Sequence, residues 1–208
     1  MTEQSTLAGG PVADLALLAN SHYLDIAVDN LFTVDECERI VSLLEPELWR
    51  YAEVQSYTAD AHEGRIDPTT RSVRQQQVPV DGTGWIYRRL SEHLSVINSE
   101  VFRFDLAPLA VHDSPNVLWY EASENDHFRP HNDAGQRFST RKLSYSVQLS
   151  DPATYVGGDL VFFPEGNLAS QDQGAVTVFP SFLHHSVTPV MSGARYALVG
   201  WLHGPTFR

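Results

Sequence analysis

The residues best suited to chemistry lie in the segment 128–133, which reads FRPHND. It places His131 and Asp133 one residue apart, and in an extended strand such a pair points to the same face. An imidazole and a carboxylate in this arrangement can occupy two adjacent positions around one metal ion. A second segment, 182–187, reads FLHHSV and can supply a third ligand. Two histidines and one carboxylate on one face of a metal are typical of non-haem Fe(II) sites, which keep the remaining positions open.

The third ligand could be either His184 or His185. Adjacent strand residues face opposite sides of a sheet, so only one of the two can reach the metal, and spacing alone does not decide which. Arg195 follows ten residues after His185 and is a fixed cation suited to binding a carboxylate. Burying an arginine on an apolar strand without an anion is costly. We therefore favour a bound carboxylate as its partner over a surface role or a core ion pair.

These residues also allow other interpretations. An isolated HxD is usually a structural strand pair, but the distal histidine and Arg195 weigh against that interpretation here. His127 and His131 have the spacing of a helical zinc site, but Pro130 between them disfavours a helix. Tyr120 is expected on a strand, where a tyrosine is usually a core residue. A solvated or packed role is expected for four further residues that could face the pocket, Arg71, Arg74, Arg129 and Gln148.

The bulk properties exclude several classes of function. The chain has 208 residues, which is long enough for one domain with a sizeable core. Its formal net charge of −12 would repel a nucleic-acid backbone, and no long basic run offsets that charge. The single cysteine, Cys37, forbids an internal disulfide and fits a reducing compartment. Because no segment reads as a signal peptide or a membrane span, we expect a cytoplasmic protein without a membrane partner.

Two helices are expected in the first half of the chain. Residues 33–36 read TVDE, a capping box in which the threonine caps the helix and the glutamate reaches back to it. An apolar stripe of helical period follows, and a second begins near Thr83. The stripes consist of Cys37, Ile40, Val41 and Leu44 in the first helix and Trp85, Ile86, Leu90, Leu94 and Ile97 in the second. The polar stretch 59–70 predicts a mobile loop near the site.

Short apolar runs separated by turn residues dominate the chain from about residue 106 onward. Strands are expected at 23–28, 50–57 and 71–80, and then at 116–121, 128–131, 143–149, 159–163, 175–179, 184–190 and 195–202. This pattern predicts a mainly β (α+β) fold, a jelly roll buttressed by N-terminal helices. We expect a flexible N-terminus at 1–20 and a single domain at 21–208. Within it, 21–105 would be a helical support region and 106–208 a metal-binding core.

The run from about 32 to 201 resembles the Fe(II)- and 2-oxoglutarate-dependent oxygenases, specifically the small prolyl-4-hydroxylase-like branch. The matching pieces are Tyr120, RPHND at 129–133, LS at 143–144, GGDLVF at 157–162, GAVTVFPS at 174–181, HSVTPV at 185–190 and GARY at 193–196. Together they cover most of the C-terminal half. The helical segment DECERI at 35–40 matches more loosely.

The resemblance implies a distorted double-stranded β-helix that holds Fe(II) at its mouth, with His131, Asp133 and His185 as metal ligands and catalytic residues. The family pattern, in which the ligand is followed by x-Val-x-Pro-Val, selects His185 over His184. Arg195 would bind the far carboxylate of 2-oxoglutarate, and Tyr120 lies where a family tyrosine often touches this cosubstrate. Ala197 departs from the family, because many members carry a hydroxyl there that can hydrogen-bond the cosubstrate.

The activity implied is hydroxylation of an unactivated C–H bond with O2, releasing succinate and CO2, with ascorbate as an optional further cofactor. Asp133 argues against halogenation, because halogenating relatives carry Gly or Ala there. The substrate would be a prolyl residue of a peptide or protein, an amino acid or a small metabolite; the oligomeric state is not indicated. Two alternatives stay open. One is a cupin-like metalloenzyme that does not use 2-oxoglutarate, and the other is a jelly-roll binding module without turnover.

Overall fold

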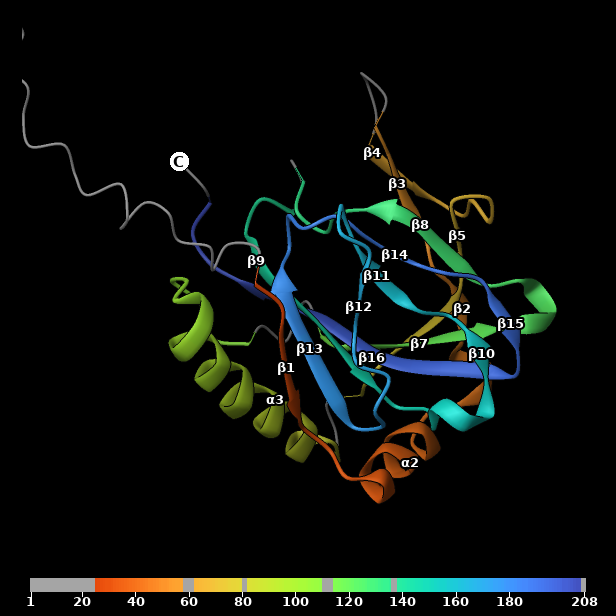
Figure 1. Cartoon of the computed structure of the whole chain (residues 1–208), viewed down its shortest axis with the longest axis horizontal. Coiled ribbons are helices and arrows are strands. Elements are labelled where there is room, and N and C mark those ends of the chain that lie inside the picture. The colour runs from red at the N-terminus through yellow and green to blue at the C-terminus, as the bar shows by residue number, and fades with distance from the viewer. Residues whose placement is uncertain (1–24, 58–61, 80–81, 110–113, 136–137, 207–208) are drawn as a thin grey trace, which may run out of the picture.

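Two antiparallel sheets form the framework of the protein, and two helices cover one of them (Figure 1). The computed structural model describes residues 25–57, 62–79, 82–109, 114–135 and 138–206, with 55–57 and 62–63 described by their backbone only. The expected flexible segment 1–20 lies outside these residues. Among them, no helix is both long and apolar enough to span a membrane.

The larger sheet has seven strands in the order β1-β13-β9-β16-β7-β6-β2. In that order the strands span Ala27–Asn30, Ala175–Pro180, Arg141–Gln148, Ala194–His203, Asn116–Glu121, Arg74–Gln77 and Arg50–Tyr51. The smaller sheet has five strands in the order β12-β11-β14-β8-β5. These span Asn167–Leu168, Leu160–Phe162, His185–Val187, His127–His131 and Arg71–Ser72. The pair of sheets is the double-stranded β-helix that the sequence predicted.

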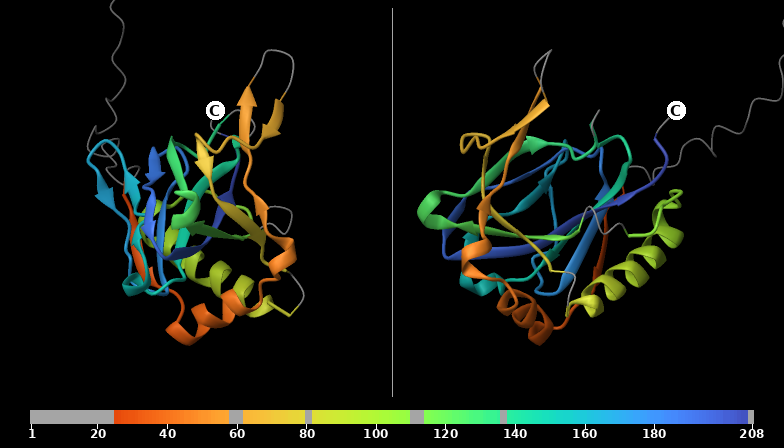
Figure 2. Two further views of the ribbon diagram at one scale, coloured as in Figure 1. Left: turned by 90° about the vertical axis from the view of Figure 1, so that its right-hand side faces the viewer. Right: turned by 180° about the vertical axis from the view of Figure 1, so that it is seen from behind.

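The two predicted helices are confirmed as α2 (Val34–Ser42) and α3 (Gly84–Ile97), the latter continuing into a π-helical turn at Asn98–Phe102. The predicted capping box is present, because Thr33 Oγ1 accepts from the Glu36 amide and the Glu36 carboxylate accepts from the Thr33 amide. Both helices lie along the side of the large sheet that faces away from the small sheet (Figures 1 and 2). There they bury their apolar stripes.

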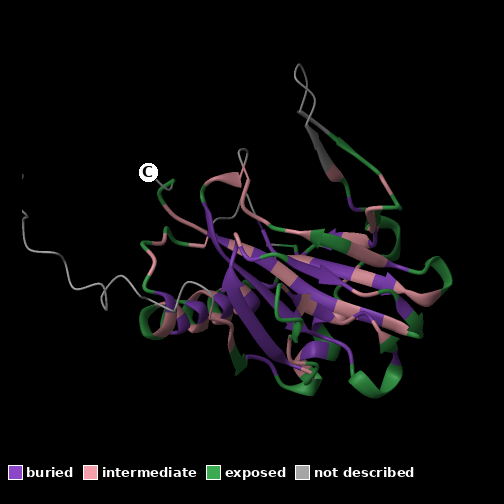
Figure 3. Cartoon of the chain, turned by 45° about the horizontal axis from the view of Figure 1, so that its top comes forward, coloured by how far each residue is buried: buried purple, intermediate pink, exposed green. Residues whose placement is uncertain are grey.

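Two apolar clusters follow from the period-2 alternation of the strands. One joins the helices to the outer face of the large sheet, and the other lies between the sheets. Along β16, Leu198 and Leu202 face the helices, whereas Val199 packs into the inner cluster and Arg195 lines a cavity there. Figure 3 shows buried residues concentrated on the strands and on the helices, with exposed residues on turns. The large sheet thus presents its alternate residues to the space between the sheets.

Several predicted boundaries were wrong. The single strand expected at 50–57 is two strands, β2 and β3 (Val54–Tyr57), and between them Ala52 donates its amide hydrogen to Val73 O. The loop expected at 59–70 contains β4 (His62–Arg65), which pairs with β3 and extends away from the body of the fold (Figures 1 and 2). Its sequence HEGR has no apolar alternation, so only its backbone pairing reveals the strand.

The strand expected at 184–190 is also divided, into β14 and β15 (Val190–Ser192). Pro189 between them has no amide hydrogen and cannot continue the ladder. β15 pairs instead with β10 (Val156–Gly157). The expected strand at 23–28 is β1, which begins only at Ala27 in the described chain.

Candidate metal centre and cosubstrate pocket

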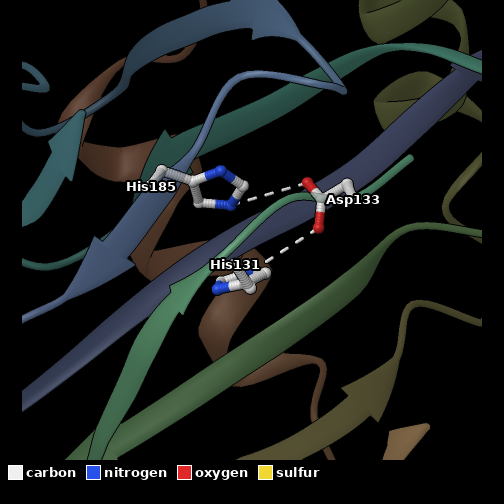
Figure 4. A group of neighbouring side chains, drawn as sticks. All are labelled: His131, Asp133 and His185. Atoms are coloured by element: carbon white, nitrogen blue, oxygen red, sulfur yellow. Dashed lines mark ion pairs between the residues drawn. The ribbon is translucent and has the colours of Figure 1, made fainter. Parts of the chain in front are cut away.

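His131, Asp133 and His185 converge at one end of the small sheet, as Figure 4 shows. His131 is the last residue of β8, His185 is the first residue of β14, and the two are directly opposite each other in this antiparallel pair. Directly opposite residues of neighbouring strands share a face, which brings the two imidazoles together. Asp133 follows β8, and its amide donates to Ser181 O at 2.8 Å.

The spacing of the three side chains suits a single metal ion. Asp133 Oδ1 lies 3.7 Å from His131 Nε2, and Asp133 Oδ2 lies 3.6 Å from His185 Nε2. The three ligand atoms all lie within 4.8 Å of one another. Ligand atoms bound at right angles to one ion, each about 2.1 Å from it, are separated by about 3 Å. The three groups therefore surround a volume of the size that a metal ion fills.

Hydrogen bonds orient both imidazoles for metal binding. His131 Nδ1 lies 2.8 Å from Arg129 O, and His185 Nδ1 lies 2.9 Å from Leu183 O. A carbonyl oxygen can only accept, so each Nδ1 carries a hydrogen, and Nε2 is the nitrogen of each ring that faces Asp133 and is left to bind a metal. This backbone support of the second ring nitrogen is the usual partner arrangement of metal-binding histidines.

Asp133 is held in place and kept ionised by its neighbours. Ser144 Oγ donates to Asp133 Oδ2 at 2.7 Å, and the Trp201 indole also donates to this carboxylate. Burial alone would raise the pKa of Asp133, but the two histidines and these donors hold that pKa below its ordinary value. Burial and the neighbouring His185 lower the pKa of His131 to about 3. At neutral pH the site therefore offers neutral imidazole and ionised carboxylate, the forms that bind a divalent cation.

A cavity between the sheets leads from these three residues to Arg195. Its volume of ≈ 60 Å³ has room for several water molecules at roughly 10–15 Å³ each. Tyr120 also lines it, and so does Ala197, which offers no hydroxyl. The rest of the wall is largely apolar, including Leu118, Leu160, Phe179, Val187 and Val199.

Arg195 is a buried cation that has no acidic partner among the described residues. Its side chain is 5% exposed, and it makes no ion pair with an acidic side chain anywhere in the described part of the chain. Arg195 Nε donates to Gln148 Oε1 at 3.0 Å, and Gln148 Nε2 donates in turn to Ser150 O at 2.9 Å and Tyr155 Oη at 3.0 Å. Because an unpaired buried guanidinium is costly, this end of the cavity fits a carboxylate ligand.

Tyr120 and Gly158 adjoin this arginine. Tyr120 is the partner of Arg195 in the β7–β16 register, and the guanidinium carbon lies 5.7 Å from its ring. Burial raises the pKa of Tyr120 despite the nearby Arg71 and Arg195, so its hydroxyl stays protonated and able to donate. Gly158, in the segment GGDLVF, has a φ of 67°, and a Cβ there would lie 3.1 Å from Arg195 Cδ. A larger residue would crowd the arginine.

The remaining predicted residues divide between the cavity and the surface. His184 is exposed, whereas His185 is buried and forms the metal-binding group together with His131 and Asp133. Arg74 forms ion pairs with Glu121 and Glu124, Arg129 is exposed, and His127 lies on strand β8 rather than on a helix. For Arg71 and Gln148 the expected solvated or packed role describes only part of what they do. Arg71 lines the cavity, and Gln148 accepts a hydrogen bond from Arg195.

Ser144 and Trp201 were missed as functional residues. The period of the strands could have indicated them. Residues 144, 146 and 148 of β9 share one strand face, as do 195, 197, 199 and 201 of β16, so Ser144 lies on the face of Gln148 and Trp201 on the face of Arg195.

A wide groove of ≈ 980 Å³ opens above the metal-binding group. His131 and Asp133 line it from below, together with Arg71, Phe128 and Trp201. Its outer wall includes Arg50, Tyr51, Glu53, Thr70, Phe138 and Arg141. The metal-binding group is therefore reachable from the surface by a molecule larger than 2-oxoglutarate.

Comparisons with known proteins agree with this geometry. The family model "2OG-Fe(II) oxygenase superfamily" matches residues 115–203, which contain all three metal-binding side chains and Arg195. A PKHD-type hydroxylase of Crocosphaera subtropica is 27% identical over 190 residues, covering 86% of this chain and 78% of that protein.

Two solved structures share the fold. A Pseudomonas putida prolyl-4-hydroxylase has a TM-score of 0.64 at 17% identity, covering 91% of this chain and 98% of that one. A Trichoplax adhaerens prolyl hydroxylase in complex with a hypoxia inducible factor peptide fragment has a TM-score of 0.67 at 16% identity, covering 91% and 86%. Over residues 115–203 the chain therefore matches the 2OG-Fe(II) oxygenase superfamily, and the match, the hydroxylase relative and the three metal-binding side chains together identify an Fe(II)- and 2-oxoglutarate-dependent hydroxylase.

Proposed function

We propose that this protein hydroxylates an unactivated C–H bond of a prolyl residue, in a peptide or as the free amino acid. The inner cavity holds 2-oxoglutarate, and the outer groove admits the substrate. The relatives named above support the prolyl assignment, since the solved structures are prolyl hydroxylases and one of them holds a peptide. The wide groove beside the metal-binding group supports a substrate of peptide size.

The observation that carries this proposal is the buried Arg195 at one end of a cavity whose other end holds two histidines and an aspartate. A dicarboxylate that reaches from the metal to Arg195 supplies the anion that this arginine lacks. Tyr120 can donate its hydroxyl hydrogen to the same ligand. A metalloenzyme without 2-oxoglutarate would have no use for the buried cation, and a binding module would have no use for an open metal site.

The residues of this chain divide the mechanistic roles as follows. Bound Fe(II) supplies the chemistry by which O2, 2-oxoglutarate and the substrate C–H bond yield succinate, CO2 and a hydroxylated product. His131, Asp133 and His185 would hold the ion where the cavity meets the groove. Arg195 and Gln148 fix the orientation of the cosubstrate. The apolar wall keeps water away from the reacting atoms.

Turnover by the iron-loaded protein tests this proposal. Prolyl peptides and free L-proline are incubated with Fe(II), 2-oxoglutarate and ¹⁸O2, and succinate and product are quantified by NMR and mass spectrometry. We expect one labelled oxygen atom in the product for each succinate released. Asp133→Ala should abolish both signals, whereas the matched control His184→Ala should retain them because His184 is exposed and outside the site. Succinate release that is independent of Asp133 would refute the proposal.

A further inference from the structure

Arg71 stands at the boundary between the inner cavity and the outer groove. It is the first residue of β5, which pairs with β8, and its partner in that register is Phe128. Its side chain lines both the cavity that contains Arg195 and the groove that opens to the surface. A substrate that approaches the metal-binding group from the groove must pass this guanidinium.

An aromatic stack places Arg71 close to the metal-binding group. The Phe128 ring stacks on the His131 imidazole, with ring centroids 3.5 Å apart and an interplanar angle of 19°. The Arg71 guanidinium carbon lies 4.7 Å from the centroid of the same Phe128 ring. Arg71 is thus one aromatic ring away from a metal ligand, within the reach of a small molecule that contacts both.

The hydrogen-bonding edge of Arg71 that suits a carboxylate has no partner among the residues that the structure describes. Nη1 donates to Glu53 O at 3.1 Å, but Nε is buried without a hydrogen bond. Nη2 donates to no described residue, and Arg71 makes no ion pair with an acidic side chain within the described ranges. Nε and Nη2 together form the fork that binds a carboxylate through two parallel hydrogen bonds.

The charges of the loaded site also leave Arg71 in need of an anion. The dipositive iron, the Asp133 carboxylate, the dianionic cosubstrate and the Arg195 guanidinium together carry no net formal charge. Arg71 then remains as an additional, half-buried cation whose Nε is shielded from water, and an unpaired charge in such a place is costly. The molecule still to enter the site is the substrate.

We propose that Arg71 is a specificity-determining residue that binds a carboxylate of the substrate next to the carbon that is hydroxylated. This inference rests on the proposed function and narrows it. A residue in the interior of a neutral peptide has no such carboxylate. The preferred substrate is a free amino acid, a C-terminal residue whose preceding residues lie in the groove, or a residue beside an acidic side chain.

The test measures binding of matched carboxylate and amide probes without turnover. The Fe(II) and 2-oxoglutarate complex is kept free of oxygen, and the probes are titrated by calorimetry. The first probes are the common amino acids and their amides. The second are peptides that end in proline, with a free or an amidated C-terminus. The third are peptides with an internal proline that is followed by either Asp or Asn. The pairs whose two members differ in affinity identify which carboxylate of the substrate is bound. We expect at least one carboxylate probe to bind about tenfold or more tightly than its amide.

Substitutions assign that preference to Arg71. Arg71→Gln should reduce the carboxylate-to-amide ratio to about one, and Arg71→Lys should restore only part of it because an ammonium lacks the planar fork. The matched control is Arg50→Gln, which removes an equal charge from the outer wall of the same groove and should leave the ratio unchanged. Equal binding of carboxylates and amides by the wild type, or no carboxylate-dependent binding by any probe, would overturn the inference.

The cosubstrate provides the second readout. Arg71→Gln should leave the affinity for 2-oxoglutarate within about threefold of wild type, whereas Arg195→Gln should weaken it by about tenfold or more. Equal losses in both variants would assign Arg71 to the cosubstrate and overturn the inference. Absence of 2-oxoglutarate binding by iron-loaded wild type would instead contradict the proposed function itself, so the two failures are distinguishable.

Discussion

Replacing Gln148 with leucine tests how the cosubstrate-binding arginine is positioned. The side chain is 2% exposed, and leucine has a similar volume but no polar atoms. The change removes the 3.0 Å acceptor of Arg195 Nε and the Nε2 amide group that donates to both Ser150 O and Tyr155 Oη. A hydrogen bond to a charged group contributes about 1.5–3 kcal/mol. Without it, Arg195 is free to leave the orientation that receives the cosubstrate.

We expect Gln148→Leu to weaken 2-oxoglutarate binding by roughly tenfold, which corresponds to about 1.4 kcal/mol. Gln148→Glu should weaken it further, because a carboxylate at 3.0 Å from Arg195 Nε would compete with the cosubstrate for the same cation. The assay is an oxygen-free titration of 2-oxoglutarate into the Fe(II)-loaded protein, followed by its visible absorption. Affinity for Fe(II) serves as the internal control, since Gln148 touches no metal ligand and should not change it. Unaltered 2-oxoglutarate affinity in a folded, iron-loaded Gln148→Leu protein would refute this reasoning.

Three further predictions concern the metal ligands, the lone thiol and the helix cap. Ser144→Ala removes the 2.7 Å donor to Asp133 and should weaken Fe(II) binding by about 10–100-fold in a metal titration, whereas Ser146→Ala should not; equal affinities would contradict the role of Ser144. Burial raises the pKa of Cys37 to about 11, so iodoacetamide at about pH 8 should label it only after unfolding, as judged by intact mass; rapid labelling of the native protein would refute its burial. Thr33→Ala removes the cap of α2 and should lower the free energy of unfolding by about 1 kcal/mol in denaturant titrations, with Thr33→Ser as the control that keeps the hydroxyl.

The metal ligands were predictable because their spacing carries the geometry. His131 and Asp133 share one residue between them, and a distal histidine with an arginine ten residues later completes the pattern. What the pattern does not contain is the pairing of β8 with β14, which sets His185 opposite His131. Spacing left His184 and His185 open, and the exposed and buried positions of the two rings separate them in the structure.

Arg71 and Gln148 show why other parts of the site were not predicted. The sequence allows both to face the pocket, yet it favours a solvated or packed role for each because nothing local distinguishes them. Arg71 reaches the site only because β5 pairs with β8 across more than fifty residues of intervening chain. Strand β4 escaped prediction for a related reason, since its polar sequence shows neither alternation nor apolar content, and its pairing with β3 is a property of the backbone. Non-local pairing, rather than residue type, decided each of these features.

The most direct test of the central claim is the oxygen-free visible spectrum of the protein with Fe(II), before and after addition of 2-oxoglutarate. A keto acid chelated to such an iron gives a weak metal-to-ligand charge-transfer band. The account predicts that this band appears in the wild type and in His184→Ala, is lost in His131→Ala, and requires much more 2-oxoglutarate in Arg195→Gln. No band from fully iron-loaded wild-type protein, or an undiminished band in His131→Ala, would contradict the assignment of the site.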